Sequence, residues 1–409
     1  MTKNTLYLFT ASFPYGTKSE TFLETEIVYL AKEFDRIVII PAIKDSEYMR
    51  DLPVNASVNT CIIATKASSG KLLFFKHFFK IVYIMTYMML TNRHNRLLYL
   101  KNFKYYLARL IGELDYFERI KPHVSKLNKD KVIFYSYWFE YCLLALCMLK
   151  KNGLIKHVIS RTHRFDLYDE ENSNRPIPFR EYKLLHADYI FCISKQGQIY
   201  LKSKVDKEFH PKILLSYLGV PKPNSLPKKT PNSISVIVSV ANLIPLKRID
   251  LIIEVLKGYT QPLRWFHFGS GPMLETLQQS LSQLPENIEA KLMGQFSNEE
   301  ILNFYSTNYV HLFISLSRSE GLPVSMMEAQ SFGIPILACD VGGVSEIVSD
   351  GVTGVLIDQH AKPQHVATLI QSTLHTDFDR SEIRQFFHNN FCAQNNYLAF
   401  SRRISKLVD

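Results

Sequence analysis

Two glutamates in one short stretch of the chain could bind the same ligand. Glu320 and Glu328 stand eight positions apart in RSEGLPVSMMEAQSFGIP. Glu320 follows an apolar run typical of a strand, and Pro323 suits the first turn of a helix that ends near Gly333. Glu328 then lies about a turn and a half inside that helix, so both carboxylates can face one extended ligand.

The chemistry of this pair suits a ligand with an anionic centre and a diol on each side. A carboxylate accepts two hydrogen bonds from neighbouring hydroxyl groups. The free N–H groups at the start of the helix favour an anion such as a phosphate between them. A nucleotide sugar, with its sugar, diphosphate and ribose, has this layout. The alternative is that one loop glutamate and one helix glutamate simply face water.

The elements that must position these residues have the rhythm of an α/β fold. Short runs rich in Val, Ile and aromatic residues alternate with segments of helical period, as in parallel sheets covered on both faces. The runs are TLYLF, RIVII, VIFYSY, HVIS and YIFCIS, then ISVIVSV, LRWFHFG, EAKLMG, VHLFISLS and IPILA. We expect two Rossmann-like, doubly wound parallel-sheet domains facing a cleft, with ligands beyond the carboxyl ends of the strands.

A proline-rich segment separates the two series of strands. Residues 220–233 contain four prolines and no apolar period, which indicates a linker. The predicted organisation is a first domain at 1–219, this linker, a second domain at 234–385, and C-terminal helices at 386–409 that pack back on the first domain. The length of 409 residues suits two such domains.

The composition favours a cytoplasmic protein. The six cysteines form no C-x-x-C pair, so reduced thiols are expected. The N-terminal run resembles a first strand more than a signal peptide. Residues 72–90 are the most apolar stretch, but Lys76, His77 and Lys80 interrupt them, so no transmembrane helix is expected.

The net charge of +10 is concentrated in residues 52–112, which hold nine Lys or Arg, no Asp or Glu, and ten aromatic residues. Several cations there recur at helical spacing, and a basic, aromatic face over about residues 66–109 suits an anionic membrane surface. The alternative is that Phe75, Phe78, Phe79 and Val82 are core residues and the lysines a solvated face. No nucleic-acid-binding module accompanies the charge, so nucleic acid is not an expected partner.

The stretch that runs on from the two glutamates resembles the donor-binding signature of family 4 of the retaining glycosyltransferases. It reads SRSEGLPVSMMEAQSFGIPILACDVGGVSEIVSDGVTGVLI, with an E-x7-E pair followed by G-G-x-x-E-I-V. VSVANLIPLKRIDLII and HFGSGPMLETL are similar to earlier parts of the same domain, and SRTHRFDLY to part of the first domain. The resemblance implies a GT-B fold with an acceptor-binding first domain, retention at the anomeric carbon, and no metal or other cofactor.

The resemblance also implies roles for individual residues of the signature. Glu320 holds hydroxyl groups of the donor sugar and acts at the catalytic centre. Glu328 binds the ribose diol. Gly321 and Leu322 present backbone to the sugar. Lys247 binds the diphosphate, where a cation offsets the charge that grows on the leaving group.

Other expected donor contacts lie outside the signature. His163 ends a strand of the first domain and matches the family's histidine beside the reacting sugar, and the Gly16 N–H approaches the diphosphate; a structural histidine and a simple tight turn are the alternatives. Gly269 and Gly271 allow a close turn near the nucleotide. The remaining expected contacts, near the base, are Gln295 and Phe296.

One position departs from the family pattern. Where the family has Gly-Arg before the loop that carries Lys247, this chain has Ala241-Asn242, so the second diphosphate-binding arginine is missing. Arg248 is the candidate to replace it.

The sequence therefore predicts a hexosyltransferase that moves a sugar from a nucleotide-diphosphate sugar to a lipid-linked acceptor of a cell-surface polysaccharide, such as capsule, lipopolysaccharide or exopolysaccharide. It would work in the cytoplasm, peripherally on the inner face of the membrane. Two alternatives remain open: an NAD-dependent oxidoreductase that uses the turn at Gly269, and a non-catalytic glycan-binding protein.

Overall fold

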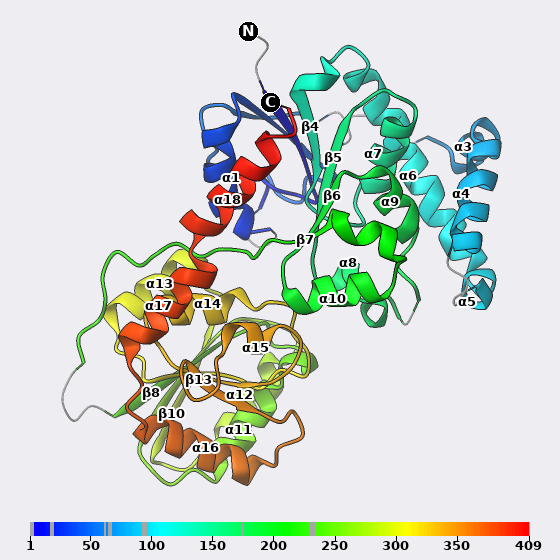
Figure 1. Cartoon of the computed structure of the whole chain (residues 1–409). Helices are drawn as coiled ribbons and strands as arrows, with labels where there is room; N and C mark the ends of the chain where they lie inside the picture. Colours follow the sequence, from blue (N-terminus) through cyan, green and yellow to red (C-terminus); the bar gives the residue numbers. More distant parts are fainter. Residues whose placement is uncertain are drawn as a thin grey trace. The chain divides into compact units, whose positions relative to one another are not determined.

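The computed structural model describes residues 4–16, 20–60, 63, 68–91, 96–173, 175–229 and 234–408. The chain divides into two compact units. The first runs to Tyr217 and includes the segment from Tyr397 onward, and the second is Leu218–Asn396. Each unit is built around one parallel β-sheet with helices on both faces (Figure 1).

The sheet of the first unit has seven parallel strands in the order β3-β2-β1-β4-β5-β6-β7. The strand order reverses direction beside β1, as in doubly wound folds, so the loops that follow β1 and β4 emerge at neighbouring positions. The strands are β1 (Thr5–Thr10), β2 (Arg36–Pro41), β3 (Ala56–Val58), β4 (Val132–Ser136), β5 (His157–Thr162), β6 (Tyr189–Cys192) and β7 (Ile213–Leu215).

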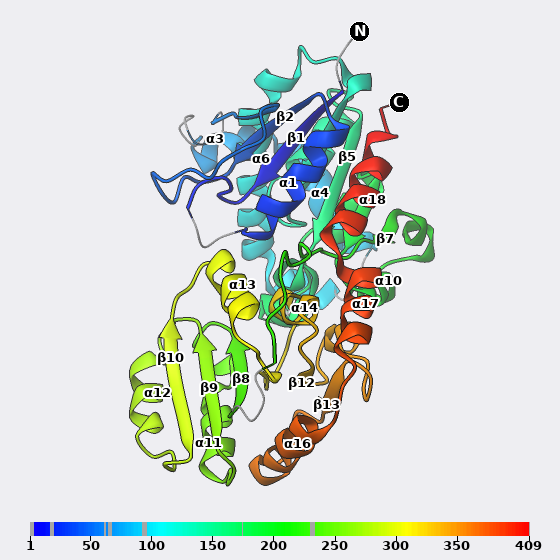
Figure 2. The ribbon, with the colours of Figure 1, turned by 90° about the vertical axis from the view of Figure 1, so that its left-hand side faces the viewer.

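Alternate residues of these strands enter two separate cores. Leu6 and Leu8 of β1 pack with helices α1 (Phe22–Glu33) and α18 (Ala393–Ser405) on one face, which Figure 2 shows in front of the sheet. Tyr7 and Phe9 pack on the other face, against α6 (Phe103–Val124), α7 (Leu143–Lys151) and α9 (Arg180–His186). This period of two is the expected consequence of strand geometry.

Three helices form a further layer outside α6 and α9. They are α3 (Gly70–Lys76), α4 (Phe78–Thr91) and α5 (Arg96–Lys101), and they contact other helices of the first unit, α6 and α9 (Figure 1). The remaining helices of this unit are α8 (Arg164–Leu167), α10 (Lys195–Ser203) and the short 3-10 turns η2 (Lys129–Lys131), η3 (Asp169–Asn172) and η4 (Lys207–Lys212).

The sheet of the second unit has six parallel strands in the order β10-β9-β8-β11-β12-β13. Its strands are β8 (Ser235–Val240), β9 (Leu263–Phe268), β10 (Ile288–Gly294), β11 (Leu312–Ser315), β12 (Ile336–Cys339) and β13 (Gly354–Ile357). Its helices are η5 (Pro245–Lys247), α11 (Ile249–Lys257), α12 (Leu274–Leu281), α13 (Asn298–Thr307), α14 (Val324–Ser331), α15 (Val344–Ile347), α16 (Pro363–His375) and α17 (Arg380–Phe391).

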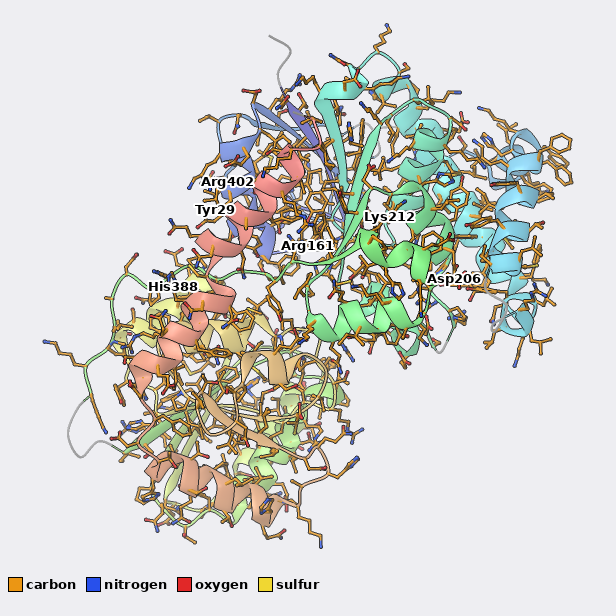
Figure 3. The ribbon with its side chains drawn as sticks, in the orientation of Figure 1. Tyr29, Arg161, Asp206, Lys212, His388 and Arg402 are labelled. Atoms are coloured by element: carbon orange, nitrogen blue, oxygen red, sulfur yellow. The ribbon has the colours of Figure 1, made fainter. Side chains whose placement is uncertain are left out.

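The C-terminal helix α18 is held on the first unit by both apolar and charged contacts. Phe400 packs over the guanidinium of Arg161, which is fully buried and paired with Glu26 at 3.2 Å. Tyr29 on α1 lies beside α18, and Arg402 of α18 pairs with Glu33 of α1 (Figure 3). These contacts attach the last residues of the chain to the sheet with which the chain begins.

The fold class expected from the sequence is confirmed, and all ten predicted strands are present. The three strands that were not predicted, β3, β7 and β13, have three or four residues each and lie at the edges of their sheets. The segment predicted as a linker begins in the second unit, where Val220 pairs with Cys392. Its last residues, 230–233, lie outside the described ones. Of the predicted C-terminal helices, α17 belongs to the second unit and α18 passes into the first at Tyr397.

Among the described residues, no single helix is long and apolar enough to cross a membrane. Helices α3 and α4 meet the length and composition for a span only when taken together, and they are bent by 84° relative to each other.

Candidate functional site

Lys247 and Glu320 meet at the carboxyl ends of two neighbouring strands. Lys247 closes η5, which follows β8, and Glu320 lies after β11, the strand that pairs with β8. The Lys247 Nζ donates to both carboxylate oxygens of Glu320, at 2.6 and 2.7 Å. The Glu320 side chain is only 10% exposed, so the pair is shielded from bulk water on most sides. A cation and a carboxylate are thus held together where a parallel α/β sheet binds its ligands.

Glu328 lies on α14, the helix that begins just after Glu320. It is 6% exposed, and burial raises the pKa of its carboxyl group to about 7. One of its oxygens, Oε1, accepts a hydrogen bond from the side-chain amide of Asn298, the first residue of α13. The carboxylate is therefore not a solvated helix residue, because it is buried and oriented by a partner from another element.

The two consecutive glycines of the signature bring its two halves into contact. Gly342 has φ of +59°, and a Cβ at this position would lie 1.8 Å from the Glu320 carbonyl oxygen. At Gly343 a Cβ would lie 2.4 Å from the Gly321 carbonyl oxygen, and the Gly343 N–H donates to that oxygen at 2.8 Å. The backbone that carries Glu320 is thereby fixed against the start of α15. Only glycine allows this approach at both positions.

The glycines after β9 have a comparable role. A Cβ at Gly269 would lie 1.9 Å from the Ala241 carbonyl oxygen, and one at Gly271 would lie 2.6 Å from the Leu243 carbonyl oxygen. The turn therefore packs closely on the loop that leads from β8 to Lys247, as the sequence predicts for a close turn. The turn at Gly269 and Gly271 therefore supports the loop that carries Lys247 through backbone contacts.

Gln295 and Phe296 follow β10, beside this turn. The Gln295 Oε1 accepts from the Ser270 hydroxyl at 2.9 Å, and Phe296 packs edge-on against Phe268 at 5.0 Å between ring centroids. Both residues thus lie at the carboxyl ends of β9 and β10. Their role near a base stays a prediction.

Leu322, next to Gly321 in the signature, is 5% exposed, so its side chain belongs to the interior and only its backbone is available for a ligand.

Arg248 is engaged elsewhere than at the Lys247–Glu320 pair. Its guanidinium donates to the Gln359 carbonyl oxygen at 2.7 Å, in the segment after β13. Its backbone has φ of +51°, a left-handed conformation that is unusual for a residue with a side chain. The replacement of the missing family arginine by Arg248 stays a prediction that would require this hydrogen bond to be exchanged.

In the first unit, His163 is enclosed by aromatic rings at the end of β5. Its ring centroid lies 4.2 Å from that of Trp138 and 4.9 Å from that of Tyr137. Burial, together with the charge of Arg161, lowers its pKa well below the ordinary value, so the imidazole is neutral. The Nε2 atom has no hydrogen-bond partner among the described residues. A neutral imidazole of this kind can donate to or accept from an uncharged hydroxyl group.

Gly16 lies in the loop after β1 and has φ of +74°. Its N–H, which we expect to approach a diphosphate, donates to the Tyr48 carbonyl oxygen at 3.0 Å, and the contact with a diphosphate stays a prediction.

The outer helices of the first unit expose large apolar side chains. Phe75 and Phe79 are 77% and 86% exposed, and Leu72, Phe78 and Val82 are also exposed. We call these five residues the α3–α4 apolar patch. The alternative that Phe75, Phe78, Phe79 and Val82 are core residues is therefore wrong.

Two of the cations beside this patch contact helix α6 of the first unit. Lys76 pairs with Glu118 of α6 at 2.6 Å, and the Nζ of Lys80 lies 3.8 Å from the centroid of the Phe117 ring. The bend between α3 and α4 changes the direction of these side chains. Residues 66–67 and 92–95 of the predicted membrane-binding region lie outside the described ones.

Comparison with known proteins agrees with the arrangement in the second unit. Residues 224–407 match the family described as glycosyl transferases group 1. Over 180 residues the chain is 31% identical to the O-antigen biosynthesis glycosyltransferase WbnH of Escherichia coli, and the match covers 44% of this chain and 48% of that protein. Over 223 residues it is 27% identical to the glycosyltransferase MJ1178 of Methanocaldococcus jannaschii, covering 54% and 58%. The chain thus spans about half the length of these relatives in the alignments.

The fold likeness covers both units. The structure of HepE from Anabaena in complex with UDP aligns with 98% of this chain and 100% of its own, with a TM-score of 0.67 and 14% identity. The chain therefore has the GT-B fold, and its residues 224–407 match the model of the glycosyl transferases group 1 family.

Proposed function

We propose that the protein is a retaining glycosyltransferase that transfers a hexose-type sugar from a nucleotide-diphosphate sugar to a hydroxyl group of a polysaccharide precursor. The observation that carries this proposal is the bidentate contact of Lys247 with Glu320, at 2.6 and 2.7 Å, together with the buried Glu328 on the helix that follows Glu320. A bound diphosphate would take over Lys247 and release Glu320 to accept hydroxyl groups of the sugar. Glu328 would accept from the ribose diol.

The chemistry that these residues supply is electrostatic. Charge accumulates on the diphosphate as the bond to the sugar breaks, and a fixed lysine in a partly buried site stabilises that charge more than water does. In the proposed front-face substitution, the departing phosphate oxygen takes the proton of the acceptor hydroxyl, which forms the new bond on the same side. No enzymic nucleophile and no metal ion are required by this proposal. His163 is the proposed hydrogen-bonding group of the first unit.

The proposed acceptor is a lipid-linked saccharide of a cell-surface polysaccharide. The similarity to an O-antigen biosynthesis glycosyltransferase supports this class of product. The α3–α4 apolar patch supports peripheral binding to the inner face of a membrane, because exposed phenylalanine side chains gain about 2 kcal/mol each when they leave water. Lys71, Lys101 and Lys104 of the same region are exposed, and these cations favour an anionic surface.

The donor proposal is tested by titrating the whole protein with UDP, GDP and NADH, followed by a product assay with the sugar forms of the nucleotide that binds. We expect one nucleoside diphosphate to bind, NADH not to bind, and transfer to persist in the presence of EDTA. Binding of NADH alone would replace the proposal with the oxidoreductase alternative. Tight donor binding without any turnover would favour the non-catalytic alternative.

The membrane proposal is tested by co-sedimentation with vesicles of neutral lipid, with and without an anionic lipid. We expect binding to the anionic vesicles and at least about a tenfold loss in a Phe75→Ser, Phe79→Ser double variant. Val54→Ser is the control, because Val54 is an even more exposed apolar residue that lies outside the patch. Equal binding by the wild type and both variants would rule out a role for the α3–α4 apolar patch in membrane binding.

A further inference from the structure

The side chain that orients Glu328 belongs to the first turn of α13. Asn298 begins this helix, and its Nδ2 atom donates to the Oε1 atom of Glu328. The position of Asn298 is fixed by a capping box around it. The Ser297 hydroxyl accepts from the Glu300 N–H at 3.2 Å, and the Glu300 carboxylate accepts from the Ser297 N–H at 2.7 Å. The amide of Asn298 is therefore held at the carboxyl end of β10 before any ligand binds.

Asn298 is the only hydrogen-bond donor that reaches the Glu328 side chain among the described residues. The other carboxylate oxygen, Oε2, has no hydrogen-bond partner in the same part of the chain. Tyr305 lies on the same helix, α13, and the charge of Glu328 is one cause of the raised pKa of its hydroxyl group. That buried hydroxyl group has no hydrogen-bond partner among the described residues. The carboxylate thus has one oxygen held and one oxygen available.

We propose that Asn298 is a positioning residue for the ribose of the nucleotide: by holding one oxygen of Glu328, it directs the other toward the ribose diol. This inference rests on the proposed function, since it assumes that Glu328 binds ribose. An amide suits the role because it donates without adding charge and has a second N–H and an oxygen left for the ligand. An aspartate at this place would instead put two carboxylates side by side.

The surroundings of Glu328 explain why one hydrogen bond matters. Burial raises the pKa of its carboxyl group, and the hydrogen bond from Asn298 lowers it again. No cation is among the causes of this shift, and no ion pair of Glu328 is present among the described residues. Without Asn298, the buried carboxylate would lose its only donor and would hold its proton to higher pH.

Two variants and one control test the role. Asn298→Ala removes the donor. Asn298→Asp keeps the shape, places a favourable acidic residue in the first turn of α13, and puts a like charge beside Glu328. Asn303→Ala is the control, because Asn303 is exposed on the same helix and no hydrogen bond of its side chain is present among the described residues.

The measurement is the affinity for the nucleoside diphosphate that the wild type binds and for its 2′,3′-dideoxy form, between about pH 5.5 and 8.5. We expect wild-type binding of the ribonucleotide to tighten as Glu328 loses its proton, around pH 7. Asn298→Ala should weaken that binding about tenfold and move its midpoint to higher pH, with little effect on the dideoxy form. The Asn298→Asp variant should bind the ribonucleotide at least as weakly as Asn298→Ala does, although it should keep the thermal stability of the wild type.

The outcomes separate this inference from the proposed function. If the wild type binds no nucleoside diphosphate, the proposed function is wrong and this inference fails with it. If the wild type prefers the ribonucleotide but Asn298→Ala has the same affinity and the same pH midpoint, only the role of Asn298 is wrong. If Asn303→Ala shows the same loss as Asn298→Ala, the effect is one of helix stability and the positioning role is rejected.

Discussion

The ammonium group of Lys247 lies between the two carboxylate oxygens of Glu320, at 2.6 and 2.7 Å, although 73 positions separate these residues in the chain. The contact joins the carboxyl ends of two neighbouring parallel strands. It also keeps each charge paired in the absence of a ligand, which lowers the cost of holding either one in a partly buried site. A diphosphate that displaces Glu320 from Lys247 would exchange one anion for another, so the lysine remains paired throughout.

Replacing Lys247 by alanine should reduce sugar transfer by at least about a hundredfold, because the charge on the departing diphosphate loses its cation. Glu320→Gln should cause a loss of similar size through its contacts with the sugar. Circular dichroism should show an unchanged fold for both. Lys257→Ala is the control, since Lys257 forms an i,i+3 surface pair with Glu254 on α11, away from the Lys247–Glu320 pair in sequence. Full turnover by Lys247→Ala would remove this residue from the mechanism.

Glu328→Gln should stabilise the unliganded protein at alkaline pH. The pKa of Glu328 is raised from 4.5 to about 7 in the folded state, so the folded protein binds more protons than the unfolded chain between these values. Stability is therefore lost as the pH rises through this window, by at most about 3 kcal/mol for the full difference. Denaturant unfolding should show the variant to be more stable at about pH 8 and equal to the wild type at about pH 4. A wild type that is as stable as the variant at alkaline pH would mean that the carboxylate is not strained by burial.

The imidazole of His163 should stay neutral throughout the neutral pH range. Its pKa is lowered by burial and by Arg161, so its ring carbon signals in NMR should not titrate between about pH 5.5 and 8. His163→Ala should reduce transfer while the pH profile keeps its shape. A titration of His163 near neutral pH would show that water reaches the ring and that the aromatic enclosure is more open than described.

Gly342→Ala should be more damaging than Gly351→Ala. Both glycines have positive φ, of +59° and +75°, so both substitutions strain the backbone by about 1 kcal/mol or more. An added Cβ meets nothing within 4 Å at Gly351, whereas at Gly342 it would lie 1.8 Å from the Glu320 carbonyl oxygen. Thermal melts should show the larger loss for Gly342→Ala, together with loss of nucleotide binding. Equal melting temperatures would mean that the two halves of the signature are not packed as described.

The regular parts of the fold could be predicted because their signals are local. A short apolar run of five or six residues, as in β1 or β8, favours a buried parallel strand. The glutamates of the signature could be predicted for a related reason. Glycine and proline mark the turn and the helix start around them, so their place at the end of β11 follows from the sequence.

Side-chain directions and contacts between distant segments could not be predicted in this way. Lys76 and Lys80 have helical spacing, but a bend of 84° between α3 and α4 turns both toward α6. Asn298 was missed because nothing at its own position distinguishes it from any exposed residue of a first turn. The capping box at Ser297 fixes where α13 starts, yet the contact with Glu328 depends on how α13 packs beside α14.

The central claim is that Lys247, with Glu320 and Glu328, binds a nucleoside diphosphate. The most direct measurement is calorimetric titration of the wild type and of Lys247→Ala with UDP and GDP. We predict that one of the two binds the wild type and that Lys247→Ala binds it at least about tenfold more weakly. Binding of neither nucleotide to the wild type, or equal binding by both proteins, would contradict the account.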